Sequence, residues 1–243
     1  MSALYDRIGR SYVATRAEDP RIAAAIHAEL GAARTVLNVG AGAGAYEPRD
    51  RDVTAVEPSA VMRAQRPPDA ARCIDASAEA LPFADAAFDA SMAVLSDHHW
   101  RHRLAGLREL RRVGRRTIVF QWNPAFAGAF WLARDYLPSF PGSQQISLAE
   151  TEAALGATRA VAVPIPHDCR DGFLMAYWRR PEAYLDPLVR ANISVFALLP
   201  AAEVDAMVDA LRADLKSGEW ARRNAALLEL DAFDFGYRVL VAE

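Results

Sequence analysis

Cysteine is scarce in this sequence. The 243 residues include only Cys73 and Cys169, which lie far apart and have no metal-ligand spacing. This excludes the disulfide framework of a small secreted domain and a cysteine-ligated metal centre, so the sequence predicts no metal site. We expect two free thiols in a reducing cytosol.

Long apolar runs and excess positive charge are also missing. No apolar stretch approaches the roughly 20 residues of a membrane span, and the opening MSALYDRIGRSY carries charges where a secretory signal has its apolar core. The net charge is −3 and the pI about 6.0, which gives no electrostatic basis for binding nucleic acid or an anionic membrane. We therefore expect a cytoplasmic protein, monomeric or homodimeric, that acts on a small molecule.

Strand and helix patterns alternate from residue 35 to about 121. Predicted strands cover 35–39, 52–56, 72–74, 88–95 and 117–121, with a short helix at 60–62 and a longer one around 104–113. This order is typical of a doubly wound, mostly parallel α/β sheet. We interpret the chain as one domain, with lead-in helices in 1–34, a core in 35–121, a cap in 122–146 and 167–235 that is mostly helical, and a last strand in 236–243.

The stretch VLNVGAGAGAYEP, residues 36–48, ends a predicted strand in glycines. Because Gly40, Ala41 and Gly42 lack bulky side chains, a ligand can lie against their main chain. The spacing fits a dinucleotide fingerprint and, equally, the first motif of a methyl-donor site. Glu57 ends the next strand, where a carboxylate can accept both hydroxyls of a ribose.

Four segments in this order, VLNVGAGAG, VTAVEPS, SAEALPFADAAFD and LSDHHW, resemble class I S-adenosylmethionine (SAM)-dependent methyltransferases, specifically the type 11 group. LYDRIGRSYVATR is similar to the lead-in helix of that group, and the likeness covers roughly residues 4–121. The resemblance implies a Rossmann-like fold, with a seven-stranded, mostly parallel sheet between helices. It also implies SAM as the cofactor.

The resemblance assigns cofactor contacts to matching positions. Gly40 and Gly42 would approach the methionyl part and the ribose, and Glu57 would bind the ribose hydroxyls. Other implied contacts are Met62 or Pro58 on the adenine, Ser77 and the Ala78 amide at the adenine edge, and Leu95 near the sulfonium. Tyr5, Tyr12 and Arg16 would share a helical face over the cofactor, with Arg16 pairing with its carboxylate.

Two positions depart from the family pattern. Asn38 stands where the family often has Asp, and Ser77 stands where Asp is common. Both residues can still form hydrogen bonds, but they remove negative charge near a cationic cofactor. We therefore expect weaker cofactor binding.

His98 and His99 follow the fourth strand, where the family places residues that face the substrate. Methyl transfer is an in-line displacement that depends mainly on positioning, but a hydroxyl or carbon nucleophile must also lose a proton. A histidine suits that task, so we predict O- or C-methylation with His98 or His99 as general base. Asp97 could orient a histidine or cap the following helix, and we favour the cap.

The acceptor would be bound by residues after the fifth strand and by aromatic residues of the cap. The candidates are Trp122, Asn123, Phe126, Trp131 and Phe196, which suggest an apolar or aromatic acceptor. An NAD(P)-dependent oxidoreductase and a non-catalytic SAM-binding protein remain alternatives. Against the oxidoreductase stand the AEALPF element and the lack of a Ser/Tyr-x-x-x-Lys set, because Lys216 is the only lysine.

Overall fold

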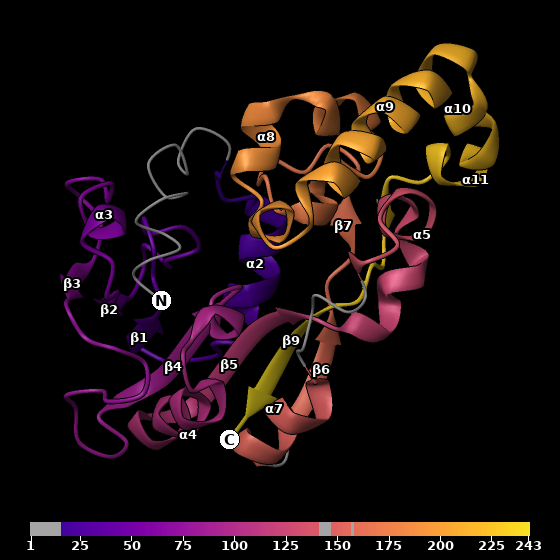
Figure 1. Cartoon of the computed structure of the whole chain (residues 1–243). Helices are drawn as coiled ribbons and strands as arrows, with labels where there is room; N and C mark the ends of the chain where they lie inside the picture. Colours follow the sequence, from indigo (N-terminus) through magenta and orange to yellow (C-terminus); the bar gives the residue numbers. More distant parts are fainter. Residues whose placement is uncertain (1–15, 141–146, 157) are drawn as a thin grey trace.

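The computed structural model describes residues 16–140, 147–156 and 158–243. A seven-stranded sheet crosses the molecule, and helices α5 and α8–α11 gather beyond one end of it (Figure 1). The strands are β1 (Thr35–Val39), β2 (Asp52–Val56), β3 (Arg72–Ile74), β4 (Phe88–Val94), β5 (Gly114–Trp122), β6 (Thr158–Ala162) and β9 (Tyr237–Ala242), and a small second sheet joins β7 (Ile165–Pro166) to β8 (Ala232–Phe233).

The strand order is β3-β2-β1-β4-β5-β9-β6. Strands β1 to β5 pair in parallel, whereas β9 runs antiparallel to both β5 and β6. This confirms the predicted seven-stranded, mostly parallel sheet, and the first three predicted strands have the observed bounds. The order changes direction between β1 and β4, which is where open α/β sheets bind ligands.

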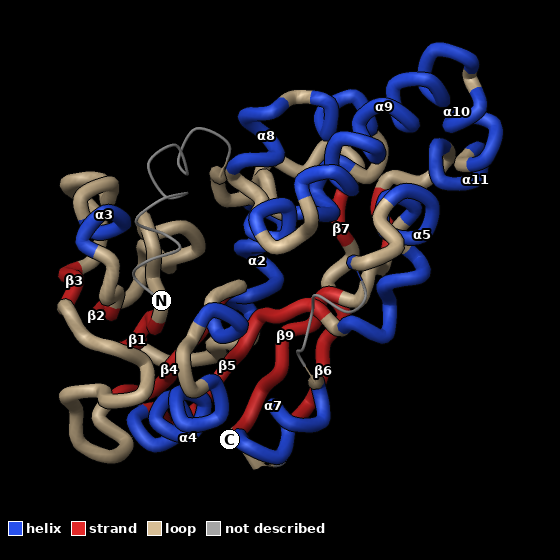
Figure 2. The backbone as a smooth tube through the Cα atoms, in the orientation of Figure 1, coloured by secondary structure: helices blue, strands red, loops and turns tan. Residues whose placement is uncertain are grey.

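Successive residues of the central strands face opposite sides of the sheet, as strand geometry requires. Val36, Met92 and Ile118 pack into a core with helix α2 (Pro20–Ala28), whereas Leu37 and Val119 face a second core under α4 (Arg103–Val113) and α7 (Leu148–Leu155). Figure 2 shows the strands as one twisted row, with α4 and α7 on the same side of it. The sheet is therefore buried on both faces, which explains its continuous apolar strands.

The helix predictions were partly right. The α4 prediction is confirmed, and Ser147 caps α7, where its hydroxyl accepts from the Glu150 amide at 3.2 Å. In the lead-in region, residues 1–15 lie outside the described residues and only Pro20–Ala28 of the remainder is helical. The predicted cap segment 167–235 contains one longer helix, α9 (Ala201–Ser217), and several short helical pieces. These are η4 (Leu174–Tyr177), η5 (Pro181–Leu185), α8 (Pro187–Ala191), η6 (Ser194–Ala197), α10 (Glu219–Arg223) and α11 (Ala225–Leu228).

The remaining helical segments frame the site or the end of β5. They are α3 (Ala60–Arg63), η2 (Asp97–His99), η3 (Pro124–Ala129) and α5 (Trp131–Tyr136). Trp131 of α5 is fully buried and packs edge-to-face against Trp220 of α10, with ring centroids 5.2 Å apart. Such aromatic pairs add to the stability that burial of their area provides.

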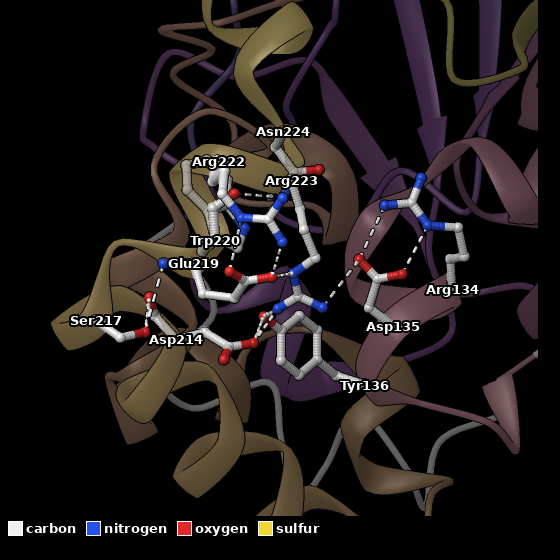
Figure 3. Close-up of polar contacts among 10 residues, drawn as sticks. All are labelled: Arg134, Asp135, Tyr136, Asp214, Ser217, Glu219, Trp220, Arg222, Arg223 and Asn224. Carbon is white, nitrogen blue, oxygen red and sulfur yellow. Dashed lines mark hydrogen bonds and ion pairs between the residues drawn. The ribbon is translucent and has the colours of Figure 1, made fainter.

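A polar cluster ties α10 to α5 and α9 (Figure 3). Arg223 forms ion pairs with Asp214 of α9 and Asp135 of α5, and its guanidinium also donates to the Tyr136 hydroxyl at 2.8 Å. These partners come from two helices and Arg223 from a third, so the cluster joins all three. The described helices include none that is long and apolar enough to cross a membrane.

Candidate active site

Two adjoining cavities lie at the carboxyl ends of the parallel strands. They have volumes of about 640 and 700 Å³ when the open space at their mouths is included. The first, the glycine-loop cavity, is lined by Arg16, Asn38, Gly40, Ala41, Gly42, Ala43, Ala45, Tyr46, Glu57, Met62, Val94, Leu95, Ser96 and His99. The second, the apolar cavity, is lined by Arg16, Leu95, His98, His99, Trp122, Phe140, Phe173, Leu174, Met175, Asn192, Ile193, Ser194, Val195 and Tyr237.

The glycine loop brings bare main chain to the first cavity. Gly40 and Gly42 have φ angles of +70° and +52°, in the region that side chains disfavour. A Cβ on Gly40 would stand 2.7 Å from the Ser96 side chain, and one on Gly42 would stand 3.3 Å from Cε of Met62. The space beside this loop therefore depends on glycine, as the sequence predicted for a loop that lies against a ligand.

Glu57 lines the same cavity and is held by two backbone amides, one of them from the glycine loop. Its Oε2 accepts from the Gly42 amide at 2.9 Å, and its Oε1 accepts from the Ser59 amide at 2.8 Å. Burial raises the pKa of this carboxyl above its usual value, while the two amides oppose that shift. Each carboxylate oxygen can accept more than one hydrogen bond, so Glu57 retains capacity for the hydroxyls of a ribose.

Asn38 lines the same cavity from β1. Its Nδ2 donates to Oε1 of Glu47 at 3.2 Å, and Glu47 is itself paired with Arg66 at 2.8 Å. Arg66 also donates to the Ala71 carbonyl at 3.0 Å. Sequence analysis missed Glu47 and Arg66, because nothing in the sequence shows that these two residues meet behind the glycine loop.

The predicted adenine contacts divide into two groups. Met62 of α3 lines the glycine-loop cavity, whereas Pro58, Ser77 and Ala78 are not among its described lining residues. Ser77 is exposed, and Ala78 is buried in the core beneath α4. The adenine contacts of Pro58, Ser77 and Ala78 therefore stay predictions.

Arg16 stands at the boundary of the two cavities and lines both. Its Nε and Nη2 donate to the buried carboxylate of Asp171 at 2.5 and 3.1 Å, and the Tyr46 hydroxyl donates to the same carboxylate at 2.9 Å. Its pairing with a cofactor carboxylate stays a prediction. Tyr5 and Tyr12, which the same prediction includes, lie outside the described residues.

Leu95 is the second residue at that boundary. It has a φ of +49°, an uncommon value for a residue with a side chain, and its amide donates to the Phe120 carbonyl at 2.9 Å. Strained positions of this kind cluster at functional sites. Leu95 lines both cavities, and its predicted position near the sulfonium stays a prediction.

His98 and His99 occupy η2, directly after β4. Their rings lie 3.8 Å apart, and both line the apolar cavity, but only His99 also lines the glycine-loop cavity. Burial lowers the pKa of both imidazoles, and the neighbouring His98 ring contributes to the larger lowering at His99. Both rings are therefore neutral at pH 7 and able to accept a proton.

The expectation that Asp97 caps the following helix is wrong. The Asp97 carboxylate is fully buried and accepts from Nε of Arg103 at 2.8 Å, and no side chain caps α4 or η2. Arg103 also donates to Gln121 of β5 at 3.2 Å and to Thr151 of α7. The ion pair prevails because an unpaired carboxylate is costly at this depth. It anchors the turn that carries the two histidines.

One of the five predicted acceptor residues, Trp122, lines the apolar cavity, and its Nε1 donates to the Phe235 carbonyl at 2.8 Å. Asn123 instead accepts from the Ala125 amide at 3.1 Å and caps η3. Phe126 packs beneath Arg238, and Trp131 and Phe196 are buried in the cap core. Acceptor contacts of Asn123, Phe126, Trp131 and Phe196 are therefore predictions without support from the cavity lining.

Most of the apolar lining was missed by sequence analysis. Phe173, Leu174 and Met175 come from η4 and the residue before it, whereas Asn192, Ile193, Ser194 and Val195 lie around the start of η6. The only feature of the sequence that could have pointed to these residues is the apolar composition of the predicted cap segment. Among the described ranges there is no group of three or more His, Cys, Asp or Glu side chains arranged to hold a metal ion.

Comparisons with known proteins agree with this geometry. Residues 37–117 match the family described as a methyltransferase domain (type 11). A crystal structure of a putative methyltransferase from an antibiotic biosynthesis pathway of Anabaena variabilis ATCC 29413 is 33% identical, with a TM-score of 0.86, over 94% of this chain and 99% of that one. The sequence matches no curated protein.

Two more distant structures show the fold alone. One is a SAM-dependent methyltransferase of Thermotoga maritima, described as a possible histamine N-methyltransferase, with 20% identity and a TM-score of 0.54 over 68% of this chain and 86% of that one. The other is the cyclase SpnF, with 17% identity and a TM-score of 0.57 over 98% of this chain and 91% of that one.

Proposed function

Because the chain belongs to the class I SAM-dependent methyltransferases, we propose that it methylates an oxygen or carbon atom of an apolar small molecule held in the apolar cavity. The family confirms SAM as the cofactor over NAD(P). The glycine-loop cavity suits SAM, because bare main chain, the Glu57 carboxylate and the apolar side chain of Met62 line one space. When bound, SAM supplies an electrophilic methyl group.

The observation that carries the proposal is the sharing of three residues by the two cavities. Arg16, Leu95 and His99 line both, so the two cavities adjoin at these side chains, where a donor in one and an acceptor in the other would come into contact. In-line transfer requires such contact between donor and acceptor. The walls of the apolar cavity are mostly aromatic and aliphatic, which favours an acceptor with an apolar body.

His99 is the better placed of the two candidate bases. Its ring lines both cavities, and its lowered pKa keeps the ring unprotonated. The same lowering weakens the ring as a base, so we propose that it takes the proton as the oxygen bonds to the methyl group, when the hydroxyl has become more acidic. A neutral ring also avoids repulsion of the cationic cofactor. His98 lines only the apolar cavity and packs against His99, so it acts on the orientation of that ring.

The acceptor can be sought with methyl-labelled SAM and small-molecule fractions of a cell extract. We expect a labelled product in an organic-soluble fraction; no labelled product in any fraction would contradict methyl transfer to a small molecule. With that acceptor, His99→Ala should lower kcat by about 10²-fold or more, whereas His98→Ala should have the smaller effect.

The same assay carries its own control. Calorimetry measures whether the His99→Ala variant still binds S-adenosylhomocysteine (SAH). Normal SAH binding with lowered activity indicates loss of the base, whereas weakened SAH binding indicates damage to the cofactor site. In the wild type, kcat/KM should fall as the pH drops below the usual histidine range, because the base becomes protonated there. Full activity in His99→Ala at every pH would exclude His99 as the base.

A further inference from the structure

The amide of Asn38 has a defined orientation. Its hydrogen-bond partner is Glu47, and an ionised carboxylate only accepts, so the NH₂ end of the amide must face Glu47. The carbonyl end, Oδ1, is directed away from Glu47. Among the described residues no donor reaches Oδ1, and Asn38 lines the glycine-loop cavity. Asn38 therefore presents an acceptor to that cavity.

Glu47 and Arg66 are almost completely buried, with side chains 9% and 5% exposed. Nη2 of Arg66 lies 2.8 Å from both carboxylate oxygens of Glu47. Nη1 of the same guanidinium reaches the Gly42 carbonyl at 3.4 Å. The pair thus contacts the glycine loop from behind while it fixes the amide that faces the cavity.

We propose that Glu47 is a positioning residue for SAM binding: with Arg66 as its counter-ion, it holds Asn38 so that Oδ1 accepts a donor group of the cofactor. Glu47 thus places a carboxylate one hydrogen bond away from the Asn38 side chain. The Asn38 amide is paired with the Glu47 carboxylate, and Arg66 balances the charge of Glu47. The three side chains together are therefore neutral, and the asparagine at position 38 does not act alone. This inference concerns the cofactor site and does not depend on the acceptor or on a histidine base.

The proposal predicts that aspartate at position 38, when it is introduced alone, weakens cofactor binding by this protein. Asn38→Asp would place two carboxylates at hydrogen-bond distance beside one guanidinium, and like charges so close disfavour ionisation of both. Glu47→Gln would leave Arg66 without a counter-ion and remove the constraint on the Asn38 amide. The double variant Asn38→Asp/Glu47→Gln exchanges amide and carboxylate and restores both the neutral total and the hydrogen bond.

Calorimetric titration with S-adenosylhomocysteine (SAH) tests this in the full-length wild type and the three variants. We expect each single variant to bind SAH roughly tenfold more weakly or worse, in line with the loss of a hydrogen bond to a charged group. The double variant should return to within about threefold of the wild type, because the two effects are coupled. Glu182→Gln, an exposed acid remote from the cavity, should bind like the wild type.

Single variants that bind SAH like the wild type, or losses that simply add in the double variant, would overturn the proposal. Asn38→Asp gives a second test that does not require Glu47→Gln to fold. As the pH is lowered toward 5, the two carboxylates should take up a shared proton, which replaces the missing amide hydrogen. The difference in SAH affinity between Asn38→Asp and the wild type should then become smaller. A deficit that is the same at pH 8 and pH 5 would count equally against the proposal.

Discussion

Replacing Gly40 by alanine tests how closely the glycine loop is fitted to the end of β4. The new Cβ would lie 2.7 Å from both Cβ and Oγ of Ser96 and 3.2 Å from Nε1 of Trp100. Ser96 cannot easily move away, because its side chain is buried and its hydroxyl donates to the Val39 carbonyl at 2.9 Å. The clash must therefore be relieved by a shift of the backbone.

The expected cost has two parts. A side chain at a φ of +70° is strained by about 1–2 kcal/mol, and overpacking at a buried site adds about 1–3 kcal/mol. The free energy of unfolding should thus fall by about 2–5 kcal/mol, within the 5–15 kcal/mol that native domains typically possess. Gly218→Ala is the matched control, since its φ is +79° but nothing lies within 4 Å of the new Cβ.

Urea unfolding at 25 °C measures both variants, and calorimetry with SAH measures the site. Gly40→Ala should be less stable than Gly218→Ala by about 1–3 kcal/mol, the overpacking part alone. It should also bind SAH at least about tenfold more weakly, while Gly218→Ala binds normally. Equal losses of stability in the two variants, or normal SAH binding by Gly40→Ala, would refute the argument from steric fit.

Two further predictions concern the carboxylates beside the cavities. Burial works against the charge of Asp19, but hydrogen bonds from Arg21 and from the Arg170 amide lower its pKa to about 2 from 3.8. Ionised Asp19 therefore adds about 2 kcal/mol to the free energy of unfolding above pH 4, and this contribution is lost as the pH falls through 2. The free energies of unfolding of the wild type and Asp19→Asn, measured in urea, should converge over that range. A difference that stays constant with pH would contradict this. Asp171→Asn should lower the free energy of unfolding by about 3–5 kcal/mol, because it breaks a buried ion pair with Arg16. Tyr46→Phe removes one hydrogen bond to the same carboxylate and should cost only about 1 kcal/mol by the same assay.

The cofactor side of the site could be predicted from the sequence because its signals are local. A β-branched strand followed by glycines, and a second strand that ends in Glu57, indicate a parallel α/β sheet and predict a ligand at its carboxyl edge. Parallel pairing then brings these strand ends to one edge. Glu47 and Arg66 were missed because their pairing depends on the path of two loops, which no periodicity records.

The acceptor side could not be predicted in the same way. Its lining comes from short 3₁₀ turns and from loop residues, where apolar side chains follow no helical or strand period. An aromatic residue in such a segment is equally suited to a core or to a cavity wall. Trp122 and Trp131 illustrate this, since each places its indole nitrogen on a backbone carbonyl at 2.8 Å, yet only Trp122 reaches the cavity.

The charges around the two cavities are balanced in pairs, and this bears on the binding of a cation. Arg16 is paired with Asp171 and Arg66 with Glu47, while His98 and His99 are neutral at pH 7 because burial lowers their pKa. SAM therefore meets no net positive charge from these groups. Glu57 and Glu47 keep two carboxylates at or behind the glycine-loop cavity, so an asparagine at position 38 does not leave this region without negative charge.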